Sequence, residues 1–253
     1  MKDVTKIITL INDIKEAKTL IKRSFALSER LGIVMEIIFV CELPMFDIPL
    51  FFKGSNKSID KEKIKTTLKH ILKELKIDKD IAVFVYIDDS VDRVNHLIKG
   101  NLDLIVLGYK EDILKEFLKD IKNPILTIKR AKEVKSAVTI MNLNSNYKKC
   151  LSISNYLFSD IKNSILYDYR FVIDPSMQID LQNIKELEEE NRKKFQEILN
   201  FAGIEGQFFT DDKTKSDKLI AHLKEYKIDL LIECSNRRDI SLANSLDIDL
   251  LYF

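Results

Sequence analysis

The residues best suited to do chemistry are a glycine and its polar neighbours, which directly follow a strongly apolar run. Gly108-Tyr109-Lys110-Glu111 comes after Asp103-Leu-Ile-Val-Leu. A glycine lets backbone N–H groups approach a phosphate closely, and a lysine nearby supplies positive charge. The chemistry that such a loop could perform is binding of a phosphate-bearing ligand.

Two further residues belong with this loop if the apolar runs are parallel strands. Asn12 follows the first run and Val40 lies near the end of the second. In open parallel sheets, ligands bind at the carboxyl ends of strands where the strand order reverses, which points to the positions after the first and fourth strands. Asn12, Gly108, Tyr109 and Lys110 hold these positions, and Val40 lies near the same end of the second strand. These five are the candidate cofactor-binding residues, and no catalytic or metal-binding residue is predicted.

The elements that must position these residues alternate along the first half of the chain. Short runs rich in isoleucine and valine indicate buried parallel strands, and apolar residues spaced three and four apart indicate amphipathic helices. Gly32 is expected to stop the first helix and Ser90 to cap the third. Strands are predicted at 6–11, 33–41, 81–87, 102–107 and 125–128, and helices at 13–31, 64–75, 90–98 and 111–121.

The second half repeats this order, with a very short last helix. His96-Leu97 and Asp103-Leu104 of the first half match His222-Leu223 and Asp229-Leu230 at one constant offset. Such self-similarity indicates a duplicated unit. We expect an α/β protein with two tandem (βα)₄β units, residues 1–130 and 131–253, the second with an eroded C-terminal helix. Each is expected to be a five-stranded, open parallel sheet with helices on both faces.

The chain resembles the universal stress protein family, whose members often occur as tandem pairs. The resemblance rests on the (βα)₄β order, on Asp103-Leu-Ile-Val-Leu-Gly108 and on Asn123-Pro124-Ile-Leu-Thr-Ile. It implies a fold like that of the adenine nucleotide alpha hydrolases. It also implies that two such units pair through their fifth strands, within one chain or between chains.

Family members that bind ATP carry an acidic residue after the first strand and a G-x-x-G loop, followed nine residues later by G-[ST]. In this chain Asn12 takes the acidic position, Gly108 matches the first glycine, Glu111 replaces the second, and Ile121-Lys122 replace the last pair. A carboxylate at a phosphate position is repulsive. The phosphate cradle is therefore degenerate in the first unit.

The second unit departs from the motif as well. Asn142 replaces the acid, Cys234 the first glycine and Arg237 the second. Lys110, Arg237 and Arg238 could offer charge to a phosphate, but lone basic residues on loops are more often solvated.

These departures predict a non-catalytic regulatory or scaffold module with a protein partner or self-association through the fifth strands, and no bound cofactor. The alternative is a protein that binds an adenine nucleotide such as ATP or AMP at a remnant site in the first unit. A weak nucleotide hydrolase is a third possibility, although the sequence carries no recognised catalytic motif.

Composition narrows the partners further. Forty-one basic and forty acidic residues leave a net charge of +1, so neither nucleic acid nor an anionic membrane is favoured. The three cysteines are widely spaced, which argues against a disulfide framework and for a reducing, cytoplasmic location. Cys234 is expected to be a buried free thiol.

Two further features of the sequence each have two possible roles. Asp88-Asp89, like Asp211-Asp212, could bind a cation, although turn and capping roles are favoured. The apolar segment Pro44 to Phe52 covers the core or meets a partner.

Overall fold

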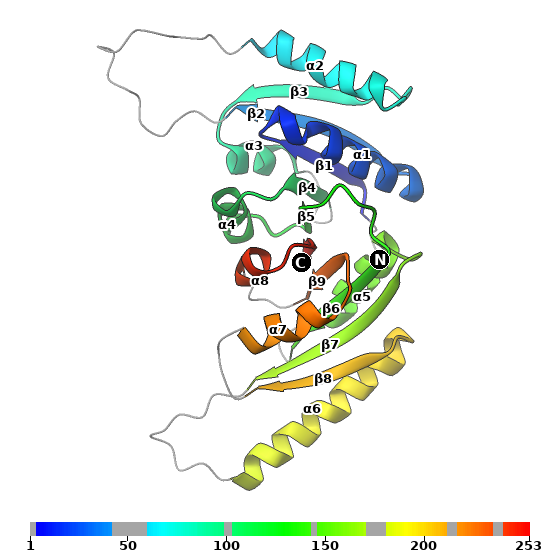
Figure 1. Ribbon diagram of the computed structural model, residues 1–253, viewed down its shortest axis with the longest axis vertical. Helices are drawn as coiled ribbons and strands as arrows, with labels where there is room; N and C mark the ends of the chain where they lie inside the picture. The colour runs from blue at the N-terminus through cyan, green and yellow to red at the C-terminus, as the bar shows by residue number, and fades with distance from the viewer. Residues whose placement is uncertain are drawn as a thin grey trace, which may run out of the picture. The chain divides into compact units, whose positions relative to one another are not determined.

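A computed structural model describes residues 4–41, 60–98, 103–142, 146–170, 181–211, 217–234 and 240–253. The apolar segment 44–52 lies outside these residues. The chain divides into two compact units, Met1–Ala131 and Lys132–Phe253. Strands and helices alternate through each unit (Figure 1), which confirms the predicted α/β class.

The described residues of unit 1, Met1–Ala131, form five parallel strands in the order β3-β2-β1-β4-β5. Their isoleucine- and valine-rich sequences suit strands that are covered on both faces. The strands are β1 (Lys6–Ile11), β2 (Val34–Cys41), β3 (Ala82–Ile87), β4 (Leu104–Gly108) and β5 (Ile125–Ile128), and the helices are α1 (Ile14–Leu31), α2 (Lys61–Glu74), α3 (Ser90–Leu97) and α4 (Glu111–Asp120).

Unit 2, Lys132–Phe253, repeats this topology in the order β10-β9-β6-β7-β8. Its first strand again lies between its second and fourth. The strands are β6 (Ser136–Met141), β7 (Lys162–Arg170), β8 (Gly206–Asp211), β9 (Leu230–Glu233) and β10 (Asp249–Tyr252), and the helices are α5 (Tyr147–Leu157), α6 (Leu181–Ala202), α7 (Asp217–Glu225) and α8 (Ile240–Ser245).

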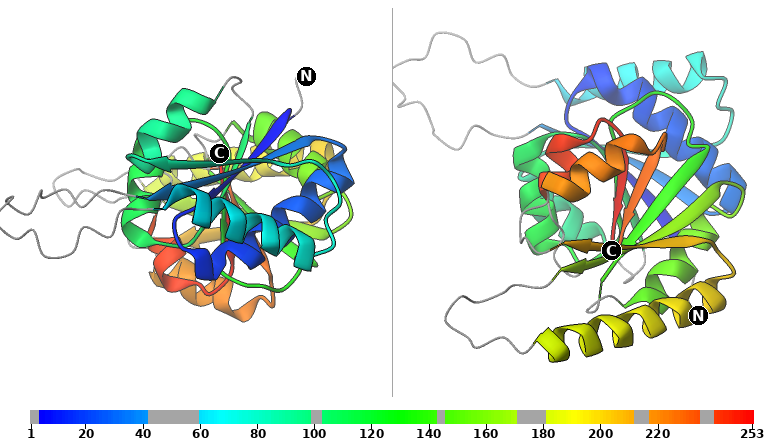
Figure 2. Two further views of the ribbon diagram at one scale, coloured as in Figure 1. Left: turned by 90° about the horizontal axis from the view of Figure 1, so that it is seen from above. Right: turned by 60° about the horizontal axis from the view of Figure 1, so that its bottom comes forward.

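The helices fall on both faces of each sheet because the crossovers step in two directions. From β1 the chain moves outward through β2 to β3, which puts α1 and α2 on one face, and it then returns past β1 to β4 and β5, which puts α3 and α4 on the other. Contacts between α1 and α2, and between α3 and α4, agree with this. In unit 2 the long helix α6 runs along β7 and β8 (Figure 2).

The core of each unit is centred on its first and fourth strands. In unit 1, Ile7, Ile8 and Leu10 of β1 have no exposed surface. Gly32 ends α1 in the left-handed conformation, at φ 65°, as the sequence predicts.

The two units share a structural tether. Asp103, directly before β4, accepts a hydrogen bond from Thr5 Oγ1 (2.9 Å) beside the start of β1. Asp229, directly before β9, accepts one from the backbone N–H of Lys135 (3.0 Å) beside the start of β6. In both units an aspartate before the fourth strand therefore holds the chain that enters the first.

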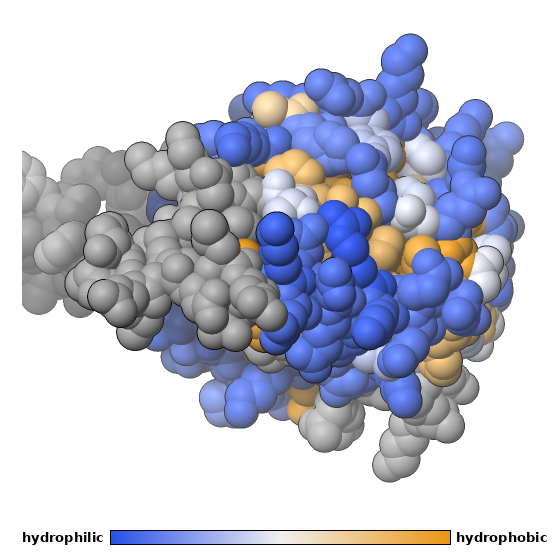
Figure 3. Space-filling view, turned by 90° about the horizontal axis from the view of Figure 1, so that it is seen from below, coloured by the Kyte–Doolittle hydropathy of each residue, from blue (hydrophilic) through white to orange (hydrophobic). Residues whose placement is uncertain are grey.

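The face in Figure 3 is mostly hydrophilic, with separate hydrophobic areas. Among the helices of the described residues, none combines the length and the apolar character that crossing a membrane requires.

Candidate functional site

The candidate site of unit 1 lies at the carboxyl ends of β1 and β4, where the strand order reverses. β1 pairs with β2 on one side and with β4 on the other. Asn12 follows β1 and Gly108 ends β4, so the structure brings these two predicted residues to adjacent strand ends. Val40, one residue before the end of β2, is completely buried.

Asn12 makes a structural hydrogen bond to α3 at this edge of the sheet. Its Nδ2 donates a hydrogen bond to Ser90 Oγ at 2.7 Å. Ser90 is the first residue of α3 and is 1% exposed. Asn12 therefore ties the end of β1 to the start of α3. The N-cap of α3 is Asp89, not Ser90 as predicted, because the serine hydroxyl is used in this contact and the Asp89 side chain accepts from the helix.

Glu16 is the site residue that sequence reasoning missed. It is the third residue of α1, and its carboxylate lies against Gly108: a Cβ added at Gly108 would collide with Glu16 Oε2. The absence of a side chain at residue 108 thus makes room for a carboxylate of the same unit. The spacing Asp13-x-x-Glu16, typical of a helix N-terminus with an acid three residues after its cap, was the available signal.

The N-termini of α1 and α4, the helices that begin near Gly108, already carry negatively charged side chains. Asp13 caps α1 by accepting a hydrogen bond from the backbone N–H of Lys15 at 2.9 Å, and Glu16 lies in the same turn. Glu111 and Asp112 lie in the first turn of α4. Helix N-termini attract anions, and here side chains of the protein provide them.

The positive groups of the site are next to Tyr109. Lys129 Nζ lies 3.8 Å from the centre of the Tyr109 ring, and Lys110 is the N-cap residue of α4 without a side-chain capping bond. Burial, and secondarily the charge of Glu111, raises the pKa of Tyr109 above its usual value. The phenol of Tyr109 is therefore un-ionised at neutral pH, with Lys110 beside it in the loop after β4 and Lys129, which follows β5, over its ring.

The acidic pair Asp88-Asp89 after β3 stabilises the turn that leads into α3, which confirms the turn and capping interpretation of this pair. Asp89 accepts a hydrogen bond from the backbone N–H of Asp92 at 2.9 Å. Asp88 accepts one from the Arg93 guanidinium, and this bond, helped by the N–H of Asp89, lowers the pKa of Asp88. Within the described ranges, no group of three or more histidine, cysteine or acidic side chains is arranged to hold a metal ion.

In unit 2 the equivalent position contains a disulfide bond. Cys234 directly follows β9, as Gly108 ends β4, and it is bonded to Cys150 in the first turn of α5, with the two Cα atoms 5.7 Å apart. The expectations that Cys234 is a free thiol and that no disulfide forms are therefore wrong. The 84-residue separation of the pair hid the contact, because only the pairing of β6 with β9 brings the two residues together. Arg237 and Arg238 lie outside the described residues.

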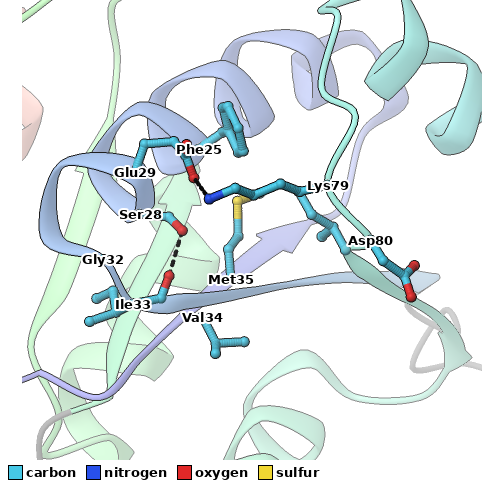
Figure 4. Close-up of a pocket in the computed structure, with 10 residues that line it drawn as sticks. Phe25, Ser28, Glu29, Gly32, Ile33, Val34, Met35, Lys79 and Asp80 are labelled. Carbon is cyan, nitrogen blue, oxygen red and sulfur yellow. Dashed lines mark hydrogen bonds and ion pairs between the residues drawn. The ribbon is translucent and has the colours of Figure 1, made fainter.

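A separate pocket of about 300 Å³ lies at the amino ends of β2 and β3, the opposite edge of the sheet from Gly108 (Figure 4). Three of its polar side chains are engaged with other groups of the lining. Lys79 Nζ lies 2.5 Å from Glu29 Oε1, and Ser28 Oγ donates to the Ile33 carbonyl at 2.6 Å. The pocket holds no nucleophile beside a base, so we assign it no chemistry.

Comparison with known proteins identifies the fold. No protein-family model and no curated protein matches the chain. Among solved structures it is similar to a universal stress protein from Archaeoglobus fulgidus DSM 4304, with a TM-score of 0.60, 12% identity, and coverage of 99% of this chain and 96% of that one. A glyceraldehyde-3-phosphate dehydrogenase, GapN from Methanocaldococcus jannaschii DSM 2661 in complex with NADP, matches with a TM-score of only 0.25, 9% identity, and coverage of 98% and 64%, and carries no argument. At 12% identity the first similarity shows a shared fold.

Proposed function

We propose that this protein is a non-catalytic regulatory or scaffold module built on the universal stress protein fold, with a strand-reversal site in unit 1 that does not take a nucleoside triphosphate. The observation that carries the proposal is the contact of the Glu16 carboxylate with Gly108. The glycine that would admit a phosphate in related ATP-binding loops lies against an anion of the same unit.

Charge around that contact supports the same conclusion. Four carboxylates, those of Asp13, Glu16, Glu111 and Asp112, lie in the first turns of α1 and α4 or at their caps. A triphosphate carries three to four negative charges and gains most at a helix N-terminus that has no anion of its own. Lys110 and Lys129 offset part of this negative charge, and Lys115 pairs with Glu111 at 2.6 Å.

The test is calorimetric titration of the purified protein with ATP, with and without magnesium, together with mass spectrometry for any ligand retained during purification. We expect no saturable binding of ATP by the wild-type protein. Glu16→Gln should improve ATP affinity by about five- to tenfold, because removing one unit charge about 4 Å from a phosphate is worth about 1 kcal/mol in water-like surroundings. Glu29→Gln, at the far end of the same helix, is the matched control and should change nothing.

Saturable ATP binding by the wild-type protein would overturn this proposal, and an affinity that Glu16→Gln leaves unaltered would show that the Glu16 carboxylate does not oppose the phosphates. The same preparations serve to examine nucleotide hydrolysis. We expect no phosphate release above the background of buffer and of the Glu16→Gln variant.

A remnant adenine-nucleotide site is the second candidate, favoured by the placement of Asn12, Gly108 and Lys110 at the carboxyl ends of β1 and β4. It predicts that AMP binds better than ATP, because a single phosphate meets less repulsion. Gly108→Val should abolish that binding by forcing the Glu16 carboxylate into the site.

The partner in the leading proposal is a protein, including another unit of this fold paired through fifth strands. The family resemblance supports this idea, and the apolar β5 residues Leu126 and Ile128 are the positions to alter. Replacing both by lysine should abolish self-association measured by light scattering. Unchanged association would exclude fifth-strand pairing.

A cytoplasmic location is also part of the proposal. Because the pair Cys150 and Cys234 is oxidised in the structure, alkylation of thiols in freshly lysed cells tests it. In a reducing compartment both cysteines should be trapped as thiols, whereas an intact disulfide in rapidly quenched cells would contradict the location.

A further inference from the structure

We propose that Cys150 and Cys234 form a reversible thiol–disulfide site at the strand-reversal point of unit 2, whose bond a dithiol reductant breaks and an oxidised partner forms again. The inference does not depend on nucleotide binding. It starts from where the two sulfur atoms lie in the fold.

Regular secondary structure holds both cysteines in place. The backbone N–H of Cys234 donates to the Ile140 carbonyl at 2.9 Å, which continues the pairing of β9 with β6. The N–H of Cys150 donates to the Asn146 carbonyl at 3.1 Å, within the start of α5. Their Cα separation of 5.7 Å lies in the range that a disulfide spans without backbone movement. The same fold can therefore hold the dithiol and the disulfide.

The cross-link lies at the rim of the core rather than in its centre. Cys150 and Cys234 are 3% and 4% exposed, whereas Leu230 and Leu231 of the adjoining strand have no exposed surface. Lys149, beside Cys150, is exposed, and its backbone N–H makes only a long hydrogen bond, 3.5 Å, to the capping Asn146 side chain. A local opening of the first turn of α5 is thus enough to admit a reductant.

The charge around Cys150 suits a leaving thiolate. The first turn of α5 contains no acidic residue, and Lys148 and Lys149 precede the cysteine. A helix N-terminus favours a thiolate over a thiol. Attack is therefore expected at the sulfur of Cys234, with the electron pair of the broken bond leaving on Cys150.

The exchange balances with a dithiol as the reductant. A thiolate of the dithiol attacks Cys234 Sγ, the bond between Cys150 and Cys234 breaks, and the Cys150 thiolate takes up a proton. The second thiol of the reductant then attacks the mixed disulfide and releases Cys234 as a thiol. The protein gains two electrons and two protons, and the reductant leaves as a disulfide; an oxidised dithiol or a small disulfide reverses the sequence.

Unit 1 cannot undergo this change, which makes the site asymmetric within the tandem. Gly108 occupies the position of Cys234, and its neighbour in the first turn of α1 is the Glu16 carboxylate. The remaining cysteine, Cys41, ends β2, where burial raises the pKa of its thiol above the usual value. Oxidation and reduction are therefore expected to act on unit 2 alone.

The test is thiol counting by alkylation and intact mass on the full-length protein, equilibrated natively over a series of reduced and oxidised dithiothreitol ratios. Of the three cysteines, one should be alkylated after denaturation of the oxidised protein and all three after native reduction. The two added thiols should appear together and disappear on reoxidation. Peptide mapping of the wild-type protein should identify a linked pair of peptides containing Cys150 and Cys234, a readout that needs no variant to fold.

Matched variants complete the test. Cys150→Ser and Cys234→Ser should each show two alkylated thiols at every ratio, whereas Cys41→Ser should retain the two-thiol change. Amide hydrogen exchange in the first turn of α5 should be faster in the reduced wild-type protein, with unit 1 unchanged. Three thiols at every ratio, a linkage that involves Cys41, or reduction only after denaturation would each overturn the proposal.

Discussion

Replacing Gly206 by alanine tests how closely α6 packs against the edge of the unit 2 sheet. Gly206 begins β8 opposite Ile165 of β7. A Cβ at this position would lie 2.6 Å from Leu199 Cδ2, 2.7 Å from the Ile165 carbonyl oxygen and 2.9 Å from Phe195 Cζ. All three distances are shorter than real Cβ atoms adopt, and the carbonyl oxygen belongs to the backbone, so a strand or a helix must move.

The size of the effect follows from two opposing terms. Overpacking of this kind costs about 1–3 kcal/mol, and the lower entropy of the unfolded chain returns about 0.4–1 kcal/mol. The net loss of about 1–2 kcal/mol should lower the thermal midpoint of a unit of this size by about 4–8 °C. Circular dichroism at 222 nm, followed through thermal unfolding, measures it.

Gly203→Ala is the matched control, three residues earlier. Gly203 has φ 63° and no atom near its added Cβ, so alanine there costs only the left-handed conformation, about 1 kcal/mol. Relieving the crowding by Leu199→Ala should recover part of the Gly206→Ala loss and none of the Gly203→Ala loss. A Gly206→Ala protein as stable as the wild type would refute the packing of α6 described above.

Three further predictions concern unit 2. The double variant Cys150→Ala and Cys234→Ala should be about 4–5 kcal/mol less stable to urea than the oxidised wild type, since the cross-link joins residues 84 apart; equal midpoints would show that the cross-link does not constrain the unfolded chain. Burial raises the pKa of Asp229, but hydrogen bonds from a backbone N–H and a lysine outweigh burial and lower that pKa. The stability that the Asp229 carboxylate contributes is therefore present above pH about 4 and is lost as pH falls through the pKa of Asp229 in the folded protein. Asp229→Asn should therefore flatten the acid limb of the stability curve measured by urea titration at pH 3 to 6. Tyr167 donates a hydrogen bond to Asn191 Oδ1 at 2.9 Å, and burial raises the pKa of Tyr167 to about 12. Tyr167→Phe should therefore cost about 1–3 kcal/mol of stability and remove the loss of stability expected between pH 10 and 12. An unchanged alkaline limb of the stability curve would contradict this.

Much of the fold could be predicted because it depends on local pattern. The isoleucine runs of β1 and β2 indicate strands buried on both faces, and the spacing of apolar residues before Gly32 indicates a helix that ends there. α4 was predicted at 111–121 and is observed at Glu111–Asp120. Such features arise from periodicity and from the conformations of single residues, which neighbouring residues in the chain determine.

The candidate site was predicted less completely, because proximity in space decides it. Asn12 and Gly108 were found as residues that follow strands, and they do lie on adjacent strand ends. Glu16 was missed because a first-turn acid is ordinarily explained by the helix dipole alone. Ser90 was taken for a cap because its side chain can serve either a helix or a neighbouring strand.

By itself, the amino-acid sequence determined the alternation of strands and helices, and it predicted a repeated unit and a loop after the fourth strand that departs from the glycine pattern of ATP-binding universal stress proteins. Only the tertiary structure decided that a carboxylate faces Gly108 in one unit and that Cys150 is bonded to Cys234 in the other. The physical reason is the strand order. Placing the first strand of each unit between its second and fourth brings the residue after the fourth strand next to the first turn of the first helix, and no local pattern records that contact.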